Sequence, residues 1–567
     1  MASEGKNMAS GAEAMVRMLQ AHDVKHIFGL CGDTSLPFYD AMYNLDHGIT
    51  HYLTRDERHG AYMADAYARV TGKVGVTEGP SGGGATYILP GLAEANESSI
   101  PVLGITTDVS VSSLGKYPLT ELDQGALMKP VTKWNGVIDT AERLPTMVRN
   151  AFRAMTTGRP GAAHLALPFD VQKHDVPEED IWGQSEFGQF PAWPSGPNPR
   201  DVEVTLDKIL AAKSPAIVVG GGVIIAGGEA ALQQFAERLD IVVATTVSGQ
   251  GSLADTHPNC LGVVGSNGGV PATRAVVDEA DLVIFISCRA GSVTTERWRS
   301  PPLGTPIVHI DSDPEVISAI YETEVSIVSD ARLALEALNL ALDMSGSAPK
   351  GFGGAARVAT AKKTKFAAFE LLAVSDDSPI KPERLIAELD RVLPDDAVVV
   401  ADPGTPCPYV SGFKPWRQAG RHFISNRAHG ALGYSLSAAM GAQVGRPGSK
   451  VISMMGDGSF GFSCGEFETA TRYNLPITFI VISNSVYGWI KAGQKTGFGE
   501  RYYNVDFNVT DHAAVAAAFG IKSWRVENPA DLNRVLKEAI AHNGPSLIDV
   551  ISQPLQDANA PVSEWVA

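Results

Sequence analysis

The chain has 567 residues, which is too long for one hydrophobic core and predicts several domains. Its formal net charge is −17 and it has no basic stripe, which argues against binding to nucleic acid or to an anionic membrane surface. The apolar fraction of 44% and the 57 glycines are typical of a large α/β protein, and a charged fraction of 19% is too low for a disordered chain.

Five scattered cysteines without a CxxC pair predict neither a disulfide framework nor a zinc site, and they fit a reducing compartment. The N-terminal segment "MASEGKNMASGAEAM" lacks the apolar core of a secretory signal. The sequence contains no run of about eighteen apolar residues, so no membrane span is predicted. We therefore expect a cytoplasmic location.

Helix-like and strand-like segments alternate along residues 8–185, from "GAEAMVRMLQAHD" through "VKHIFGL" and "HGAYMADAYARVTG" to "IPVLGITTD". This alternation predicts a parallel sheet covered by helices. The segment "GQFPAWPSGPNPRD", rich in proline and glycine, then predicts a linker.

Two further α/β domains are predicted, at residues 200–345 and 379–555, from buried strands such as "PAIVVGGGV", "ADLVIFIS", "KVISMMGDG" and "LPITFIVISN". Residues 346–378 are predicted to be a linker and residues 556–567 a C-terminal tail. The fold class is thus α/β, with three mostly parallel sheets flanked by helices. The first and third domains could be paralogous halves.

The stretch "TRDERHG", residues 54–60, places five ionisable side chains between an apolar strand and an alanine-rich helix. From these residues alone, a solvated turn with local ion pairs is the simplest interpretation.

In the third domain an apolar strand ends in Gly456, Asp457 and Gly458, and the next strand ends in Asn484. The glycines allow a tight turn and close approach to a ligand, and the free N–H groups of the following helix can hold a phosphate. Carboxylate and amide oxygens suit magnesium bridging to a diphosphate.

Together these features resemble the thiamine-diphosphate binding motif, and the domain order resembles the acetolactate-synthase-like branch of thiamine-diphosphate enzymes. The resemblance implies thiamine diphosphate and Mg²⁺ as cofactors, with the backbone carbonyl of Val486 as third metal ligand beside Asp457 and Asn484. Leu432 matches the apolar wedge that bends the cofactor, although it could be an ordinary core leucine. The other implied cofactor contacts are Gly404, Thr405, Pro406, Gly430, Gly456, Gly458, Ser459, Tyr487 and Gly488.

Glu57 matches the family's glutamate, which lies at the end of a strand and is hydrogen-bonded to the cofactor's pyrimidine ring. A partly desolvated carboxyl with a raised pKa would drive the tautomer change that generates the ylid. We expect Glu57 to point inward and Asp56 and Arg58 outward. His59 is either a proton shuttle or a capping or surface histidine. The resemblance also implies a homodimer or homotetramer whose active sites are shared between subunits.

The substrate side departs from the family pattern. Cys31 and Asp33 stand at the proline and the second glycine of its P-G-G loop, Gly32 matches the first glycine, and all three are possible substrate-pocket residues. Cys31 is expected to be a small packed residue rather than a nucleophile. Thr120 stands at the family's active-site glutamine, and Trp489 at a methionine. Thr120 and His429 are candidate catalytic residues. Arg427 and His429 could meet a substrate carboxylate, move protons or make a structural contact on the diphosphate side.

The central domain raises the question of a flavin, because biosynthetic members of the branch bind FAD there. Candidate contacts are Gly220, Gly221, Gly222, Arg289 and Asp311, but the acidic pair that usually follows the arginine is missing. Related enzymes use this domain for FAD, for ADP or for no ligand, so FAD stays open.

We therefore predict a thiamine-diphosphate- and magnesium-dependent lyase or transferase acting on small carbonyl compounds. Acetolactate-synthase-like decarboxylation and carboligation of a 2-oxo acid is the first expectation. A non-ligating decarboxylase and a C–C hydrolase of a diketone are alternatives, and an inactive regulatory or scaffold paralogue is a third. A nicotinamide dehydrogenase is disfavoured because no GxGxxG with a later acid is present.

Overall fold

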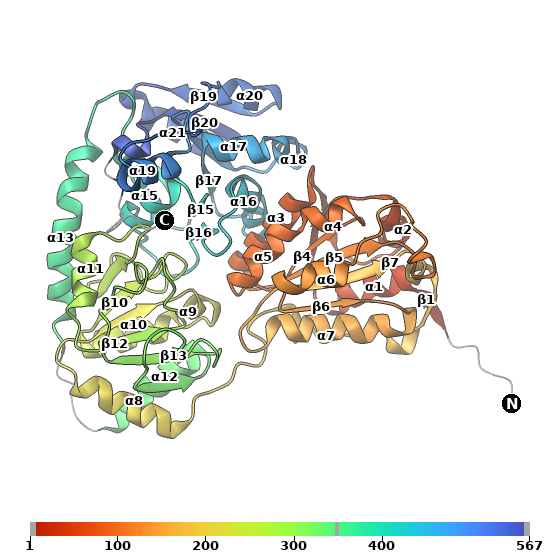
Figure 1. Ribbon diagram of the computed structural model, residues 1–567, viewed down its shortest axis with the longest axis horizontal. Coiled ribbons are helices and arrows are strands. Elements are labelled where there is room, and N and C mark those ends of the chain that lie inside the picture. Colours follow the sequence, from red (N-terminus) through yellow and green to blue (C-terminus); the bar gives the residue numbers. More distant parts are fainter. Residues whose placement is uncertain (1–6, 346–350, 559, 561–567) are drawn as a thin grey trace. The chain divides into compact units, whose positions relative to one another are not determined.

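The computed structural model describes residues 7–345, 351–558 and 560. It contains three six-stranded parallel sheets, each flanked by helices, which confirms the predicted fold class (Figure 1). The chain divides into two compact units. The first comprises the chain up to Trp193 with Ala428–Pro447 and Gly465–Tyr473, and the second comprises the remainder.

The sheet of the first unit has the order β3-β2-β4-β5-β7-β6. Its strands are β2 (His26–Gly29), β3 (Thr50–Leu53), β4 (Gly75–Gly79), β5 (Val102–Asp108), β6 (Trp134–Val137) and β7 (Ala163–Pro168). A separate antiparallel pair joins β1 (Met8–Ser10) to β8 (Asp175–Pro177).

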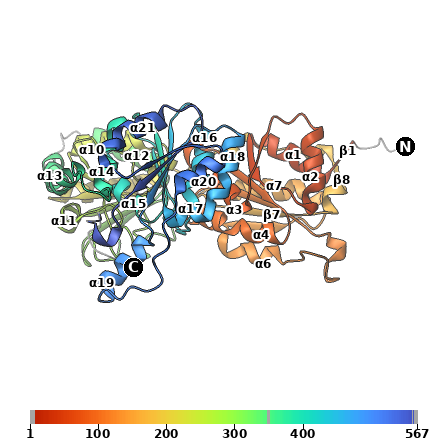
Figure 2. The ribbon, with the colours of Figure 1, turned by 90° about the horizontal axis from the view of Figure 1, so that it is seen from above.

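Helices cover both faces of this first sheet (Figures 1 and 2). On one face α1 (Gly11–Ala21), α2 (Leu36–Asn44) and α7 (Leu144–Thr156) share a core with the strands. The other face carries α3 (Glu57–Thr71) and α5 (Leu89–Glu97), with α16 (Tyr434–Gly445) packed on α3. The unit also contains α4 (Gly83–Tyr87), α6 (Gln124–Met128) and α18 (Phe467–Arg472).

The second unit holds the other two sheets. The central sheet has the order β11-β10-β9-β12-β13-β14, with strands β9 (Ala216–Val219), β10 (Val242–Thr245), β11 (Cys260–Val263), β12 (Val283–Ile286), β13 (Ile307–Asp311) and β14 (Val325–Val328). Its helices are α8 (Pro199–Ala211), α9 (Gly222–Ile225), α10 (Glu229–Leu239), α11 (Pro271–Asp278) and α12 (Ala331–Met344).

The third sheet has the order β16-β15-β17-β18-β20-β19, with strands β15 (Val398–Ala401), β16 (Phe423–Ser425), β17 (Val451–Gly456), β18 (Thr478–Ser483), β19 (Lys522–Val526) and β20 (Ser546–Ile551). Its helices are α14 (Pro382–Val392), α15 (Pro406–Phe413), α17 (Asp457–Ser463), α19 (Gly488–Gly497), α20 (His512–Ala518) and α21 (Leu532–Ile540).

The first and third sheets have the same topology. Numbered within each domain, both follow the order 2-1-3-4-6-5, and the central sheet follows 3-2-1-4-5-6. The shared order supports the prediction that the first and third domains are paralogous halves. In open parallel sheets ligands bind at the carboxyl ends where the strand order reverses. The strand order reverses between β2 and β4, between β9 and β12, and between β15 and β17. Ligand sites are therefore expected at the carboxyl ends of these three pairs of strands.

The predicted linker at residues 346–378 is wrong in part. Residues 346–350 lie outside the described residues, but α13 (Gly354–Ala373) is a twenty-residue helix. Val358 and Ala361 belong to the central core, and Phe369 and Ala373 belong to the core of the third sheet. Packing at both ends stabilises this helix, a contribution that local pattern does not reveal. Most of the predicted tail likewise lies outside the described residues.

No helix within the described parts of the chain is both long and apolar enough to cross a membrane.

Candidate active site

Glu57 is the first residue of α3 rather than the end of a strand. Asp56 caps this helix, because its Oδ1 accepts a hydrogen bond from the Arg58 backbone N–H at 2.8 Å and its Oδ2 pairs with the Arg58 guanidinium at 2.9 Å. Glu57 is only 6% exposed, whereas Asp56 and Arg58 are half-buried. As expected, Glu57 points inward and Asp56 and Arg58 are more exposed. The cause is the capped start of a helix and not the alternation of side chains along a strand.

Two glycines make room for the Glu57 side chain. A Cβ at Gly79 would lie 3.0 Å from Glu57 Cγ, and one at Gly84 would lie 3.0 Å from Glu57 Oε1. Burial raises the pKa of Glu57, and the charges of Asp56 and Glu78 raise it further. A carboxyl in this environment can keep its proton at higher pH than an exposed glutamate.

Thr120 lies against the glycine-rich loop that adjoins Glu57. Its Oγ1 is 2.7 Å from Ser81 Oγ, and a Cβ at Gly82 would lie 2.7 Å from the Thr120 Cβ. Thr120 itself is exposed and has a positive φ of 71°. The structure therefore brings this predicted residue to the loop beside Glu57.

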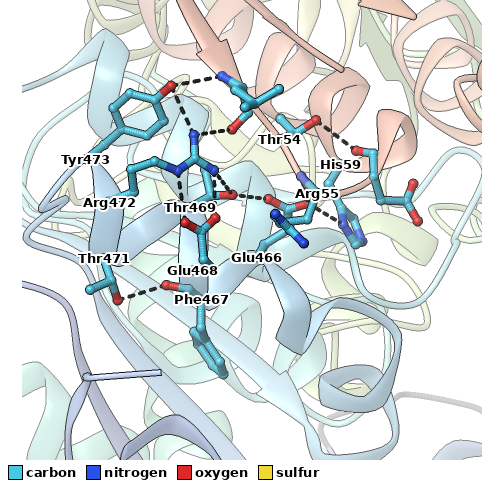
Figure 3. Close-up of polar contacts among 12 residues, drawn as sticks. Thr54, Arg55, His59, Glu466, Phe467, Glu468, Thr469, Thr471, Arg472 and Tyr473 are labelled. Carbon is cyan, nitrogen blue, oxygen red and sulfur yellow. Dashed lines mark hydrogen bonds and ion pairs between the residues drawn. The ribbon is translucent and has the colours of Figure 1, made fainter. Parts of the chain in front are cut away.

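Residues 466–473 form hydrogen bonds with the junction between β3 and α3, residues 53–59, which contains Glu57 (Figure 3). Glu466 is fully buried, and its Oε1 accepts from the Arg55 backbone N–H at 2.8 Å and lies 3.1 Å from His59 Nδ1. Its Oε2 accepts from the Thr469 hydroxyl at 2.7 Å. The expectation of a capping or surface His59 is therefore wrong, because this histidine is buried against a carboxylate that the sequence did not point to.

Two further side chains of this segment hold the same junction. The Arg472 guanidinium donates to the Leu53 carbonyl at 2.9 Å, and the Leu53 N–H donates to the Tyr473 hydroxyl at 2.9 Å (Figure 3). Backbone groups on both sides of Thr54 are thus fixed.

The loop after β2 meets the loop after β4 at the reversal point of the first sheet. A Cβ at Gly32 would lie 2.4 Å from Pro80 Cβ, so only glycine fits there. Cys31 and Asp33 are exposed in the single chain. The expectation of a packed Cys31 is therefore wrong.

The segment before α16 carries the predicted wedge. Gly430 and Gly433 have positive φ angles of 75° and 83°, and Leu432 between them is only half-buried. An ordinary core leucine would be fully buried, so this exposure favours the wedge interpretation. His429 is exposed, and its backbone N–H donates to Glu94 Oε2 at 2.7 Å.

In the second unit, Asp457 joins the ends of two strands. Its Oδ2 accepts from the backbone N–H groups of Asn484 at 2.7 Å and Ser485 at 2.5 Å, and its Oδ1 accepts from Gly458 N–H at 2.9 Å. Burial raises the pKa of Asp457, while these N–H groups act in the opposite direction. The carboxylate and Asn484 are therefore held side by side.

The remaining predicted contacts of this domain lie around the same edge. A Cβ at Gly458 would lie 2.6 Å from the Tyr487 ring, and one at Gly488 would lie 3.3 Å from Thr405 Oγ1. Gly404, Thr405 and Pro406 follow β15, and Ser459 is buried in α17. The loops after β15 and β17 thus both contact the loop after β18, beside the point where the strand order reverses and a ligand site is expected in an open sheet.

The Val486 backbone is positioned by a bridge to Asp506. The bridge is closed by Tyr487 N–H to the Val505 carbonyl and Phe507 N–H to the Ser485 carbonyl, so it does not use the Val486 carbonyl. One carboxylate, one amide and one carbonyl form a donor set that fits Mg²⁺, which prefers oxygen ligands.

Arg427 makes a structural contact in this domain, because its guanidinium donates to the Pro403 carbonyl at 2.9 Å. Trp489 packs, partly buried, against the domain core. These contacts therefore do not support a role for Arg427 or Trp489 in binding the substrate.

A buried polar network behind Asn484 was missed by sequence reasoning. The Ser483 hydroxyl donates to Asp549 and lies 2.9 Å from His512 Nδ1, and Arg525 donates to Asp549 at 3.2 Å. The one available signal was Ser483 itself, which stands where the family pattern has a second asparagine.

The predicted flavin contacts follow three adjacent strands of the central sheet: Gly220–Gly222 after β9, Arg289 after β12 and Asp311 at the end of β13. A Cβ at Gly220 would lie 1.8 Å from the Ser287 carbonyl oxygen and one at Gly222 would lie 2.5 Å from the Ser287 Cβ. These two glycines are therefore required by packing of the protein itself, whether or not a nucleotide binds.

Comparison with known proteins agrees with this architecture. Three family models match the chain: the N-terminal TPP binding domain of thiamine pyrophosphate enzymes at residues 9–127, their central domain at 202–338 and their C-terminal TPP binding domain at 402–550.

Full-length relatives are also similar. A "Probable acetolactate synthase large subunit" from Methanococcus aeolicus is 34% identical over 96% of this chain and 92% of its own length. The acetolactate synthase large subunit of Lactococcus lactis is 31% identical, with 96% and 92% covered, and isozyme 3 of Escherichia coli is 30% identical, with 94% and 92% covered.

The fold and these matches define a thiamine-pyrophosphate-dependent enzyme. Within that class the chain belongs to the acetolactate-synthase-like family.

Proposed function

We propose that this enzyme decarboxylates a 2-oxo acid and joins the remaining fragment to a second carbonyl compound, as an acetolactate synthase does. The observation that carries the proposal is the buried Glu57 between two glycines that admit its side chain. Bound thiamine diphosphate would supply a carbanion and an electron sink. Glu57 would hold a proton at the pyrimidine ring, and the apolar surroundings that raise its pKa would keep that proton in place.

Asp457, Asn484 and the Val486 carbonyl are proposed to hold Mg²⁺ against the diphosphate. The support is the close attachment of Asp457 to the backbone of Asn484 and Ser485. The loop Gly404–Pro406 would bind the diphosphate, and Leu432 would shape the cofactor between two glycines with positive φ.

We further propose a homodimer or homotetramer with shared active sites, located in the cytoplasm. FAD in the central domain is a possibility that an absorption spectrum of the purified protein would test. A flavin would have to use Arg289, which follows β12 at the reversal point between β9 and β12, and Asp311, which ends the adjacent strand β13.

A non-ligating decarboxylase or a C–C hydrolase is the second candidate. The observation that favours it is Thr120, whose hydroxyl bonds to Ser81 where the family pattern has an amide. Without that amide the acceptor carbonyl would lose a hydrogen-bond donor, so the intermediate would be released by protonation or water.

The test incubates wild type, Glu57→Gln and Asp457→Asn with pyruvate, glyoxylate and cyclic diketones, and separates ligation, decarboxylation and hydrolysis products. We expect ligation by wild type, no turnover by Glu57→Gln despite retained cofactor, and loss of magnesium-dependent cofactor binding by Asp457→Asn. Asp396→Asn, an exposed change in the same domain, is the control. Near-normal turnover by Glu57→Gln would refute the assignment of Glu57.

A further inference from the structure

Thr120, the candidate catalytic residue beside the glycine-rich loop, has an unusual backbone conformation. Its φ of 71° lies in the left-handed region, which is costly for a side chain that branches at Cβ. Such a conformation persists only where the surrounding structure holds it, and it is found mostly at functional sites. Because Thr120 is exposed, specific contacts and not burial must hold it.

A chain of four hydroxyl groups leads from strand β5 to Thr120. Thr107 Oγ1 lies 2.8 Å from Thr34 Oγ1, and Thr34 Oγ1 lies 3.2 Å from Ser81 Oγ. Ser81 Oγ lies in turn 2.7 Å from Thr120 Oγ1. Thr107 is only 1% exposed, so the chain runs from the interior of the first unit to its surface. It crosses the carboxyl ends of β5, β4 and β2, where a ligand site is expected.

The last bond of this chain fixes the direction of the others. Thr120 Oγ1 is 2.5 Å from the Leu119 carbonyl oxygen, and a carbonyl only accepts, so Thr120 donates its single proton there. The Ser81 hydroxyl must therefore donate to Thr120, and the Thr34 hydroxyl must donate to Ser81. By the same argument Thr107 donates to Thr34. All four protons point toward the surface, and hydrogen bonds aligned in this way strengthen one another.

Thr34 is the central member of the chain. Its hydroxyl oxygen also accepts from the Ser81 backbone N–H at 3.1 Å, so its one proton and both lone pairs are used. Its backbone carbonyl accepts at 2.9 Å from the side-chain amide of Gln172, which is completely buried. One oxygen atom of Thr34 thus joins the loops after β2 and β4 to strand β5, and a change there would reach Thr120 through Ser81.

We propose that Thr34 is a positioning residue, which acts through the Ser81 hydroxyl to hold the Thr120 O–H group ready to donate to a substrate carbonyl oxygen. The proposal rests on the proposed function and on contact between Thr120 and the substrate. A substrate oxygen that gains negative charge accepts more strongly than the Leu119 carbonyl, so the Thr120 proton would turn toward it. This hydroxyl would then supply the donor that is lost where the family pattern has an amide.

The first test follows the Thr120 side chain by NMR in the full-length protein without cofactor, using threonine labelled with ¹³C and ¹⁵N. The Thr120 methyl resonance is the one lost in Thr120→Ser, and three-bond couplings to the methyl carbon report the side-chain rotamer. We expect a single rotamer in wild type and in Thr34→Ser, which keeps the hydroxyl. In Thr34→Val, which has a similar shape but no hydroxyl, we expect averaging between rotamers. Thr146→Val, an exposed change on α7, is the control.

Ser81→Ala is the second variant, in case Thr34→Val fails to fold. It removes the link between Thr34 and Thr120, so it should also release the Thr120 rotamer. A single, unchanged rotamer in both variants would overturn the proposal. Averaging in Thr34→Ser as large as in Thr34→Val would overturn it too, because the shape of the side chain and not its hydroxyl would then hold Thr120.

The second test compares kcat and KM for the reaction that wild type catalyses. We expect Thr34→Val to lower kcat about two- to tenfold, the effect of one ordinary hydrogen bond, with KM nearly unchanged and with Thr34→Ser close to wild type. An unchanged kcat, or an effect confined to KM, would contradict the donor role. Because the rotamer is measured without cofactor or substrate, it does not depend on whether wild type forms a ligation product, so this proposal and the proposed function can fail separately.

Discussion

Glu466 and His59 form a fully buried pair in which the carboxylate Oε1 lies 3.1 Å from the imidazole Nδ1. The carboxylate accepts this hydrogen bond when Nδ1 carries the imidazole proton. The same oxygen holds the backbone of Arg55, so Glu466 contacts the chain two residues before and two residues after Glu57.

We expect Glu466→Gln to disturb Glu57 more than it disturbs the fold. The amide provides one acceptor where the carboxylate serves three donors, and one buried donor left unsatisfied costs about 1–3 kcal/mol. The exchange rate of the cofactor's reactive C–H should fall about tenfold or more, with a smaller change in cofactor affinity. Glu468→Gln, whose side chain is 41% exposed, is the control and should change the rate less than about twofold. Equal losses in both variants would contradict the role given to Glu466.

Gly79→Ala should impair activity while Gly83→Ala should not. The methyl group at 79 would press on Glu57 Cγ at 3.0 Å, whereas a Cβ at 83 meets nothing within 4 Å. We expect turnover to fall by about tenfold or more for Gly79→Ala, with both variants still folded by circular dichroism. If the two variants have the same turnover, the pocket around Glu57 is looser than the structure indicates.

Arg69→Met should strongly destabilise the first unit. Arg69 is buried between Asp65 at 2.9 Å and Glu94 at 3.1 Å, and Tyr434 of α16 also bonds Asp65 at 2.5 Å. Removing this cation leaves two buried carboxyl groups without it, which costs about 3–5 kcal/mol. Urea unfolding of this variant against Arg153→Met, an exposed change on α7, measures the effect. Equal midpoints would show that the buried ion pairs carry no net stability.

Lys365→Met should stabilise the protein near neutral pH. Burial lowers the pKa of Lys365 to about 8. Below pH 8 the folded protein must hold a charged, desolvated lysine, at a cost on the order of 3 kcal/mol, and this cost disappears as the pH rises through the unfolded pKa of about 10.5. We expect the variant to exceed wild type in free energy of unfolding at pH 7 and the difference to shrink by pH 9.5. A difference independent of pH would mean that packing, not charge, sets the effect.

Some of the site followed from sequence because it depends on short motifs. Asp457 and Asn484 are close since both end neighbouring parallel strands, and strand ends are visible as a change from apolar residues to glycine and polar residues. Helix α3 begins at Glu57, two residues before the helical pattern that starts at His59, and Asp56 before an alanine-rich run is the helix-capping signal for that start.

The contacts around Glu57 that were missed come from distant parts of the chain. His59 and Glu466 are separated by 407 residues, and no local pattern pairs them. Glu78 carried a usable signal, because an acidic residue inside a buried strand requires partners. Its partners Tyr39 and His51 come from a helix and from β3, which β2 separates from β4 in the sheet, so only the folded chain identifies them.

Helix α13 sets a limit on how this protein could be rebuilt from modules. Val358 and Ala361 near its start complete the central core, and Phe369 and Ala373 near its end complete the core of the third sheet. A chimera that exchanged either domain at residues 346–378 would divide one helix between two hydrophobic interiors of different ancestry. Crossover points for recombination therefore belong outside the helix, and the central and diphosphate-binding domains should be exchanged together.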